Sequence, residues 1–246
     1  MSCAAVLGCD KNAVQELVAP PPAAAQIKFF NFGVGAPNVN FYAGNTKLTG
    51  ISSTTGVEST LGTAYGVAAA GGFYVAVAPG QYSLSGRITA TTDKDLAVSN
   101  VNATLAAGKR YSLYQSGFYS TTTKTVEAFV IEDDFTLPTN FTAASVRFVN
   151  SISNANPMVL YARATTVDST VYTLGADVAY KSAGAFTSIP TGSYNLFTRY
   201  TGSTTNVITR TAVGFLGGRV YTVTARGDIT STAAARVPTL DNTANY

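Results

Sequence analysis

Residues 27–31 read IKFFN, and residues 146–150 read VRFVN. Each stretch sets one basic residue among apolar and aromatic residues and closes on asparagine. Aromatic and β-branched residues of this kind favour a short β-strand. The return of the same strand far along the chain decides the fold, because it predicts two copies of one domain rather than a single large one.

Further landmarks follow each copy of this stretch in the same order. An Ala-Tyr pair at 64–65 is matched by a second pair at 179–180. The turn and strand VAPGQYSL at 77–84 are matched by SIPTGSYNL at 188–196. The segment AGKRYSL at 107–113 is matched by GGRVYTV at 217–223. The offset between the copies shrinks from 119 residues at the first landmark to 110 at the last. Loops that change length between strands of constant order produce such a drift.

The pattern within each copy predicts antiparallel sheets. Segments such as 111–114 and 220–223 alternate with period two and follow glycine turns. Roughly seven short strands per copy are typical of a β-sandwich, and the lack of Trp and of a cysteine pair in the body excludes an antibody-type domain. We therefore expect an all-β protein of two tandem immunoglobulin-like antiparallel β-sandwiches, with a tether at 1–25, repeats at 26–137 and 143–232, and a C-terminal tail at 233–246.

The composition excludes several classes of function. Charged residues make up 12% of the chain, and its 16 basic residues are spread rather than clustered, which argues against nucleic-acid binding. Histidine is absent, and both cysteines, Cys3 and Cys9, lie within the first nine residues. A catalytic His or Cys and a zinc site are therefore excluded from the body of the protein, and no cofactor is expected.

The N-terminal segment resembles the end of a bacterial lipoprotein leader. Val6-Leu7-Gly8-Cys9 resembles a lipobox, in which the cysteine is acylated, although only eight residues precede Cys9 and none is basic. The Ala/Pro-rich segment 17–25 predicts a semi-extended spacer. We expect an exported protein in the outer membrane, at the cell surface or in the periplasm, anchored through lipid on Cys9. The alternative is an unmodified tail with two free thiols.

The two copies meet at residues 132–140, EDDFTLPTN, an acidic, Pro-containing segment suited to a domain boundary. Its adjacent carboxylates, Glu132, Asp133 and Asp134, are candidate calcium ligands, since oxygen donors suit a hard cation. The alternating Asp/Asn spacing of a dedicated calcium loop is missing, however. We therefore prefer the alternative, a solvated strand end without a metal.

With the repeat laid out, the chain resembles a bacterial family named domain of unknown function 4397. Members carry an opening (Arg/Lys)-Phe-Val-Asn strand, a proline and a Val-x-(Val/Leu/Phe)-Tyr strand, a Pro-x-Gly-x-Tyr turn and a Gly-Lys-x-Tyr strand, often in tandem. The matching residues are 28–31, Pro37, 39–42, 79–82 and 108–111, and then 147–150, Pro157, 159–161, 190–194 and 218–221. Copy one departs by a Gly/Ala-rich insertion near 68–72, and copy two by a turn one residue wider. The resemblance implies an exported, frequently lipid-anchored β-sandwich over about residues 26–230, and it implies no catalytic residues.

Three functions fit these observations. The first, which we prefer, is a non-enzymatic surface or periplasmic binding and adhesion module for an envelope glycan or protein. The second is a structural subunit that self-associates by edge-strand pairing. The third is a hydrolase that pairs two carboxylates across a cleft. Its candidate residues are Asp93, Asp95, Glu132, Asp133, Asp134, Asp168 and Asp177.

Two further sets of residues look like recognition motifs, but we expect structural roles for them. Tyrosine offers an apolar ring and a polar tip to a ligand, yet it serves core and cross-strand packing equally well. We expect packing roles for Tyr42, Tyr82, Tyr111, Tyr161, Tyr194 and Tyr221. Arg226-Gly227-Asp228 is the tripeptide that integrin ligands display, but it follows a predicted strand, where Gly-Asp is ordinary turn chemistry.

Overall fold

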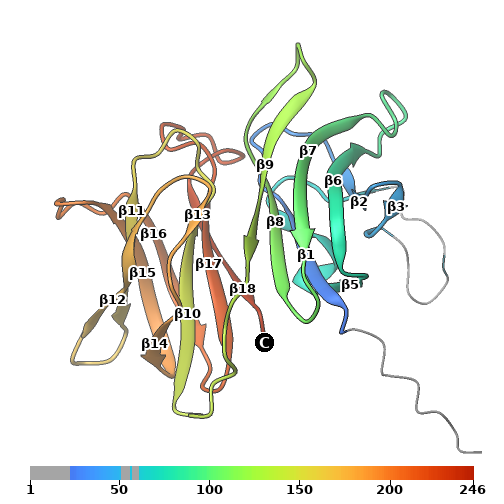
Figure 1. Ribbon diagram of the computed structural model, residues 1–246. Coiled ribbons are helices and arrows are strands. Elements are labelled where there is room, and N and C mark those ends of the chain that lie inside the picture. The colour runs from blue at the N-terminus through green and yellow to red at the C-terminus, as the bar shows by residue number, and fades with distance from the viewer. Residues whose placement is uncertain (1–22, 51–55, 57–60) are drawn as a thin grey trace, which may run out of the picture.

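The computed structural model describes residues 23–50, 56 and 61–246. In these residues the protein is all-β, with one short 3-10 segment, and its strands form two sandwiches of two sheets each (Figure 1). The predicted fold class, an all-β protein of two tandem β-sandwiches, is confirmed. None of the described residues belongs to a helix with the length and apolar character needed to span a membrane.

The first sandwich pairs the sheet β4-β1-β8-β9, to which β5 adds through β1, with the sheet β3-β2-β6-β7. Its first and penultimate strands, β1 and β8, run parallel, and the other neighbours pair antiparallel. The elements are β1 (Ala25–Asn31), β2 (Val39–Ala43), β3 (Thr46–Lys47), β4 (Val67–Ala68), η1 (Ala69–Gly72), β5 (Val75–Val77), β6 (Gly80–Ile88), β7 (Ala97–Leu105), β8 (Arg110–Ser120) and β9 (Thr125–Glu132).

The second sandwich repeats this topology. The sheet β13-β10-β17-β18, with β14 added through β10, faces the sheet β12-β11-β15-β16, and β10 and β17 form the parallel pair. The strands are β10 (Ala143–Asn150), β11 (Met158–Ala164), β12 (Val171–Val178), β13 (Ser182–Ala183), β14 (Thr187–Pro190), β15 (Gly192–Tyr200), β16 (Ile208–Phe215), β17 (Val220–Arg226) and β18 (Thr239–Ala244). The duplication read from the sequence therefore extends to strand order and pairing.

Alternation along the strands explains why each sandwich is stable. Successive side chains of a strand point to opposite faces, so every second residue enters the core between the two sheets. In the first sandwich Ile27 and Phe29 of β1 enter that core, and in the second Val146 and Phe148 of β10 do so. The Phe29 ring also stacks on Phe41 of the facing sheet, with the ring centroids 5.0 Å apart.

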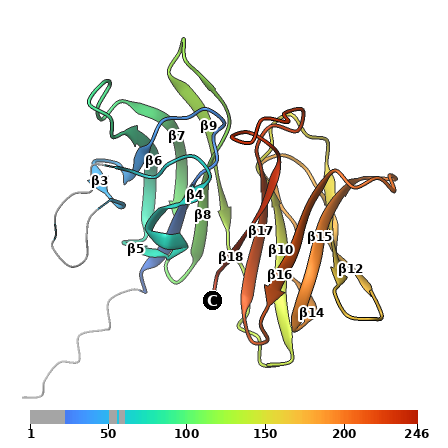
Figure 2. The same ribbon diagram turned by 180° about the vertical axis from the view of Figure 1, so that it is seen from behind.

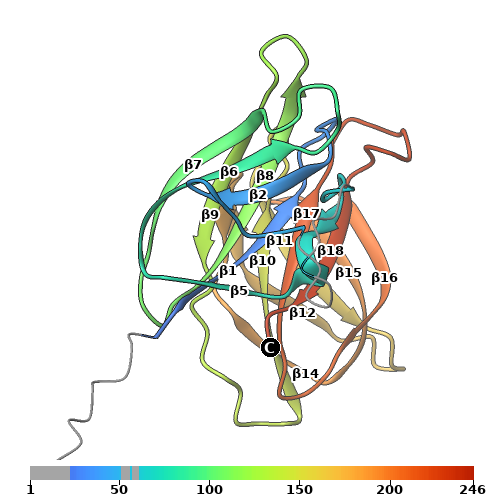
Figure 3. The same cartoon turned by 90° about the vertical axis from the view of Figure 1, so that its right-hand side faces the viewer.

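The two sandwiches stack so that the four sheets form consecutive layers (Figure 1, and from behind in Figure 2). The sheets that contain β1 and β10 meet in the middle, and the sheets of β6 and β15 are the outermost layers. A third apolar cluster fills the junction between the sandwiches, made of Phe30, Phe32, Tyr114, Phe129 and Val149. The view along the stack shows the layers overlying one another (Figure 3).

The C-terminal segment differs from the sequence expectation. Residues 233–246 are expected to form a tail, whereas the structure places β18 in this segment, paired antiparallel with β17. Leu240 of β18 is fully buried in the second core. Four of the six residues of β18 are polar, so the segment lacks the apolar content that marks the other strands, and pairing with β17 supplies what its own sequence does not.

The Gly/Ala-rich insertion of the first copy forms β4 and η1 and lies against the second sandwich. Gly72 adopts a φ of +81°, and a Cβ added there would approach the Thr243 side chain to 3.1 Å. Glycine suits this position because it combines a left-handed backbone with close packing on β18. The insertion therefore contributes to the junction between the two copies.

Candidate functional site

The strand β6 and its counterpart β15 present matching outward strips. Tyr82 and Leu84 of β6, like Tyr194 and Leu196 of β15, point into the cores, so the alternate residues face outward from the outermost layers. We call these outward residues the outer strips. The first outer strip is Gln81, Ser83, Ser85 and Arg87, and the second is Ser193, Asn195, Phe197 and Arg199. Both strips begin with polar residues and end with an arginine.

In the first outer strip the guanidinium of Arg87 lies over an aromatic ring. Its Cζ is 4.4 Å from the centroid of Tyr42, and the Lys47 ammonium lies 5.4 Å from the same ring. Arg87 donates hydrogen bonds to the Gly44 carbonyl at 2.7 Å and to the Ser85 hydroxyl at 3.3 Å. The guanidinium is thus held in place by these hydrogen bonds and gains cation–π stabilisation from the Tyr42 ring.

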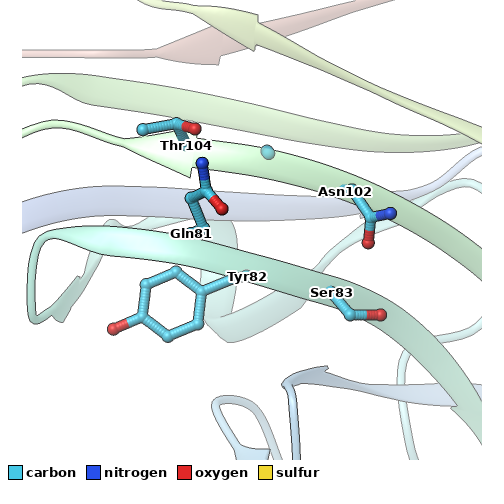
Figure 4. A pocket seen from close by; sticks show the side chains of 6 residues that line it. Gln81, Tyr82, Ser83, Asn102 and Thr104 are labelled. Carbon is cyan, nitrogen blue, oxygen red and sulfur yellow. The ribbon is translucent and has the colours of Figure 1, made fainter.

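The other end of this strip borders a shallow groove of about 440 Å³. The groove lies over β6 and β7, and Figure 4 shows its lining side chains on these two adjacent strands. Its exposed side chains are carboxamides and hydroxyls, namely Gln81, Ser83, Asn102 and Thr104. Amides and hydroxyls both donate and accept hydrogen bonds, so the groove can pair with the hydroxyl groups of a polar ligand.

The second outer strip carries the same pairing of arginine and aromatic ring. Arg199 lies 5.3 Å from the centroid of Tyr161 and 4.7 Å from that of Phe197. The two rings are stacked at 5.3 Å, and Arg163 approaches the Phe197 ring to 5.8 Å. Arg199 also donates a 2.8 Å hydrogen bond to the Asn206 side chain. Equivalent positions of the two sandwiches therefore hold a guanidinium on an outward aromatic surface.

The repeated tyrosines have structural roles. Tyr42, Tyr111, Tyr194 and Tyr221 are buried, while Tyr82 and Tyr161 are half-buried. The hydroxyls of Tyr82 and Tyr194 donate to the carbonyl four residues earlier, at 2.8 and 2.7 Å. Those of Tyr111 and Tyr221 accept, at 3.1 Å in both copies, the backbone N–H five residues earlier. The packing roles predicted for these residues are confirmed, and the hydroxyls of Tyr82, Tyr111, Tyr194 and Tyr221 also secure a turn of their own copy.

The carboxylates considered for hydrolysis lie on separate elements. Asp93 and Asp95 occupy the turn between β6 and β7, and Asp93 forms an ion pair with Lys124 at 2.6 Å. Asp168 lies in the turn before β12, and Asp177 lies exposed on β12 itself. Acid–base hydrolysis would need a second carboxylate near Asp93. The structure instead places the Lys124 ammonium beside it.

The acidic segment at the junction is also divided. Asp133 is 2% exposed and turned inward, where it forms an ion pair with Arg147 and accepts hydrogen bonds from Tyr74 at 2.6 Å and Ser112 at 2.7 Å. Glu132 instead forms a surface ion pair with Lys109, and Asp134 is exposed. In the described residues no group of three or more possible ligands is placed to hold a metal ion. Asp133 is thus a buried structural anion, where the sequence suggested either a calcium ligand or a solvated strand end.

The Arg226-Gly227-Asp228 tripeptide is engaged in internal contacts. Arg226 is the last residue of β17, where it forms an ion pair with Asp241 and lies 5.5 Å from the Phe32 ring centroid. The ion pair and hydrogen bond with Asp241 raise the pKa of its guanidinium, although burial acts in the opposite direction and is the largest single influence. Asp228 accepts hydrogen bonds within its own turn from Thr230, at 3.0 and 2.8 Å.

Some sequence-based expectations lie outside the described residues. The lipobox with Cys9, the other thiol at Cys3 and residues 17–22 of the Ala/Pro spacer belong to residues 1–22, whereas Ala25 at the end of the spacer is already the first residue of β1. Sequence reasoning also missed the outer strips, although the necessary signal was present. Aligning GQYSLSGRI of 80–88 with GSYNLFTRY of 192–200 brings Arg87 and Arg199 into register.

Comparison with known proteins identifies the family. Among curated proteins, no match to the chain was found. A family model described as Domain of unknown function (DUF4397) matches residues 25–161. The match begins at the first residue of β1, covers the first sandwich and ends within β11, and it spans more than half of the chain. The protein therefore belongs to the domain of unknown function 4397 family.

Proposed function

We propose that this protein is a non-enzymatic binding and adhesion module of the bacterial cell envelope, and that its outer strips contact an envelope glycan bearing anionic groups. The observation that carries the proposal is the repetition of an outward guanidinium–aromatic pair, Arg87 on Tyr42 and Arg199 on Tyr161. These arginines lie at equivalent strand positions, and each ends an outward row that begins with polar side chains.

The chemistry of the strips suits a glycan that carries carboxylate or phosphate groups. Guanidinium groups bind both anions through paired, charge-assisted hydrogen bonds. The neighbouring groove over β6 and β7 offers uncharged carboxamides and hydroxyls, which match the hydroxyls of sugar rings. A chain of sugars that bears periodic anionic groups would engage both parts of the first strip.

The placement of the strips favours adhesion over simple capture. The two outermost layers face away from each other across the four-layer stack (Figure 1). One molecule would therefore hold two ligand chains, or two parts of one network, at once. Within a polymeric network that surrounds the molecule, two linked weak sites bind far more tightly than either site alone, because the second contact forms at high effective concentration.

The proposal assigns no catalytic residue. Three of the candidate carboxylates, Asp93, Glu132 and Asp133, form ion pairs with Lys or Arg side chains, which supports a structural role for them. It also includes export and a lipid anchor on Cys9, motivated by the lipobox-like residues and by the spacer that leads into β1. Intact-mass analysis of the protein from its native host tests the anchor. A chain that begins at an acylated Cys9 supports it, and one that retains Met1 with two free thiols contradicts it.

The glycan contact is tested by co-sedimentation with purified envelope polysaccharide and peptidoglycan at low and high salt. Arg87→Gln and Arg199→Gln should each lower the apparent affinity about 10- to 150-fold, since each removes a charge-assisted contact of roughly 1.5–3 kcal/mol. The double variant should lose salt-sensitive binding altogether. Arg219→Gln is the matched control, because it removes the same charge from an exposed turn before β17. Equal binding by the double variant and the control would contradict the assigned surface.

Self-assembly is a second candidate, favoured by the position of β7 and β16. Each strand lies at the end of its sheet order, so one side of its backbone is available for pairing with another chain. Sedimentation velocity over a wide concentration range tests this alternative. A single monomeric species at the highest concentration rules it out, whereas reversible growth with concentration supports it.

A further inference from the structure

The contact between the two sandwiches is built twice from equivalent residues. Lys28 of β1 lies opposite Ser112 of β8, and Arg147 of β10 lies opposite Thr222 of β17, at the same place in the two parallel pairs. Both basic side chains point away from their own core toward the other copy. Lys28 has no exposed surface and Arg147 is 2% exposed.

Each basic side chain reaches the residue that follows the last strand of the other copy. Arg147 binds the Asp133 carboxylate, and Lys28 binds the Asn245 side-chain oxygen. Asp133 and Asn245 are equivalent residues, because each donates its backbone N–H at 2.7 Å to the carbonyl of the residue that starts the neighbouring strand, Arg110 or Val220. The contact is therefore reciprocal.

The surrounding contacts repeat the same relation. Ser112 donates to Asp133 at 2.7 Å, and in the other half Asn245 donates to Thr222 at 2.8 Å. Arg147 also reaches the carbonyl of Glu132 at 3.0 Å, and Lys28 reaches that of Ala244 at 3.5 Å.

The tyrosines of the paired Ala-Tyr landmarks extend the relation to the far side of the junction. The ring centroid of Tyr65 in the first copy lies 5.3 Å from the Cζ of Arg226 in the second. Tyr180 of the second copy bonds Ser116 of the first at 2.9 Å, and Ser116 occupies on β8 the place that Arg226 occupies on β17. A surface on which residue i meets j while j meets i is the signature of two-fold pairing between like subunits.

We infer that this face is a homotypic docking surface, which recognises a second copy of the same fold about a pseudo-two-fold axis, and that the second sandwich needs Asp133 of a first sandwich as its partner. Pairing the second sandwich with itself would set Arg147 against Asn245 at both contacts. Two buried guanidinium groups would then share no carboxylate, an arrangement that burial penalises heavily. The second sandwich is therefore complete only when it docks onto a first one.

The charge count at the junction sharpens the inference. The natural pairing buries the two cations Lys28 and Arg147 with the single carboxylate of Asp133. Asn245→Asp would place a second carboxylate beside Lys28 and complete the symmetric arrangement. Asp133→Asn would remove the only carboxylate among these four residues and leave both cations buried without a counter-ion.

The test separates docking from covalent linkage in the folded full chain. A site-specific protease sequence is inserted between Pro138 and Thr139, and the purified protein is cut and examined by size exclusion and sedimentation on dilution from micromolar to nanomolar. We expect the two cut halves to migrate together with the mobility of the uncut protein. Separation of the natural halves at micromolar concentration would overturn the inference.

Three variants test the assigned residues. Asp133→Asn should weaken the association of the cut halves about 100-fold, while its exposed neighbour variant Asp134→Asn, the matched control, should leave it unchanged. Asn245→Asp should tighten the association about 10-fold, a gain that misfolding cannot produce. Natural affinity in Asp133→Asn, or weaker docking in Asn245→Asp, would overturn the inference. Retained far-ultraviolet circular dichroism in the separated halves shows that Asp133→Asn acts on docking.

Discussion

Lys28 is a basic residue in a place where a charge is costly. Burial lowers the pKa of its ammonium to about 8. The nearby Asp133 carboxylate raises this pKa, and the Arg147 guanidinium lowers it further. The Tyr74 hydroxyl donates a hydrogen bond to Asp133, and the centroid of the Tyr74 ring lies 4.7 Å from the Lys28 Nζ. A lysine at this position of the family's opening strand thus serves the junction between copies.

The lowered pKa of Lys28 predicts a pH dependence of stability. Between about pH 8 and 10.5 the unfolded chain holds a proton on Lys28 that the folded protein has released, so the free energy of unfolding rises with pH. From pH 8 to 10 the rise should be on the order of 2 kcal/mol. Above pH 10 the free energy of unfolding should fall again. Burial raises the pKa of Tyr74 and raises that of Tyr114 to about 12. These two tyrosines therefore ionise in the unfolded chain before they ionise in the folded protein.

Urea denaturation at intervals from pH 7 to 11 measures this dependence. Lys28→Met, which keeps the length of the side chain but cannot be charged, should remove the rise between pH 8 and 10. A natural protein whose stability is flat over that range, or a Lys28→Met variant with the same slope as the natural protein, would contradict the assignment.

Among the elements, β18 carries more than its length indicates. It completes the sheet of β10 and β17 and buries Leu240 in the second core. It also places Asn245 against Lys28 of the first sandwich and pairs Asp241 with Arg226, which contacts the Phe32 ring. The alternating inward and outward residues of this single strand therefore join the second core to the junction.

Leu240→Ala should cost about 2–5 kcal/mol of unfolding free energy, because it removes a fully buried side chain and leaves a cavity. Thermal and urea unfolding measure the change. Leu216→Ala is the control, since Leu216 is 63% exposed and its truncation should stay within about 0.5 kcal/mol. Equal effects of the two substitutions would mean that residues 239–244 behave as a tail in solution.

At the scale of the whole molecule, two sandwiches share a junction with both apolar and ionic parts. The cluster around Phe30, Tyr114 and Phe129 stacks its rings at 4.7 and 5.1 Å, and the reciprocal contacts of Lys28 and Arg147 adjoin it. A junction built in this way couples the unfolding of its two halves more strongly than the polar, mobile contacts typical of linked domains.

Scanning calorimetry should therefore show one cooperative transition, with the calorimetric and van't Hoff enthalpies equal. Asp133→Asn should split the transition into two, because each sandwich keeps its own core while the junction loses its carboxylate. Asp134→Asn should retain the single transition. Two independent steps in the natural protein would show that the sandwiches unfold separately despite their contact.

Local patterns in the amino-acid sequence are sufficient to predict several features of this protein. Period-two alternation in stretches such as 27–31 and 220–223 indicates strands, and Gly and Pro turns separate them, so the all-β class and the duplication could be predicted. The repeated tyrosines could be assigned to packing for the same reason. Arg87 and Arg199 were also accessible through the alignment of the two copies, although their stacking on aromatic rings required the positions of neighbouring strands.

The roles of Lys28, Asp133, Arg147 and Asn245, in contrast, depend on how the two sandwiches pack together. A polar residue at an outward strand position indicates a solvent-facing side chain, and a pair of acidic residues indicates a surface turn. Their burial comes from a second sheet whose residues lie up to 217 positions away in the chain, as for Lys28 and Asn245. Local sequence cannot encode a contact over that separation, because the free energy that buries these charges comes from packing two completed sandwiches together.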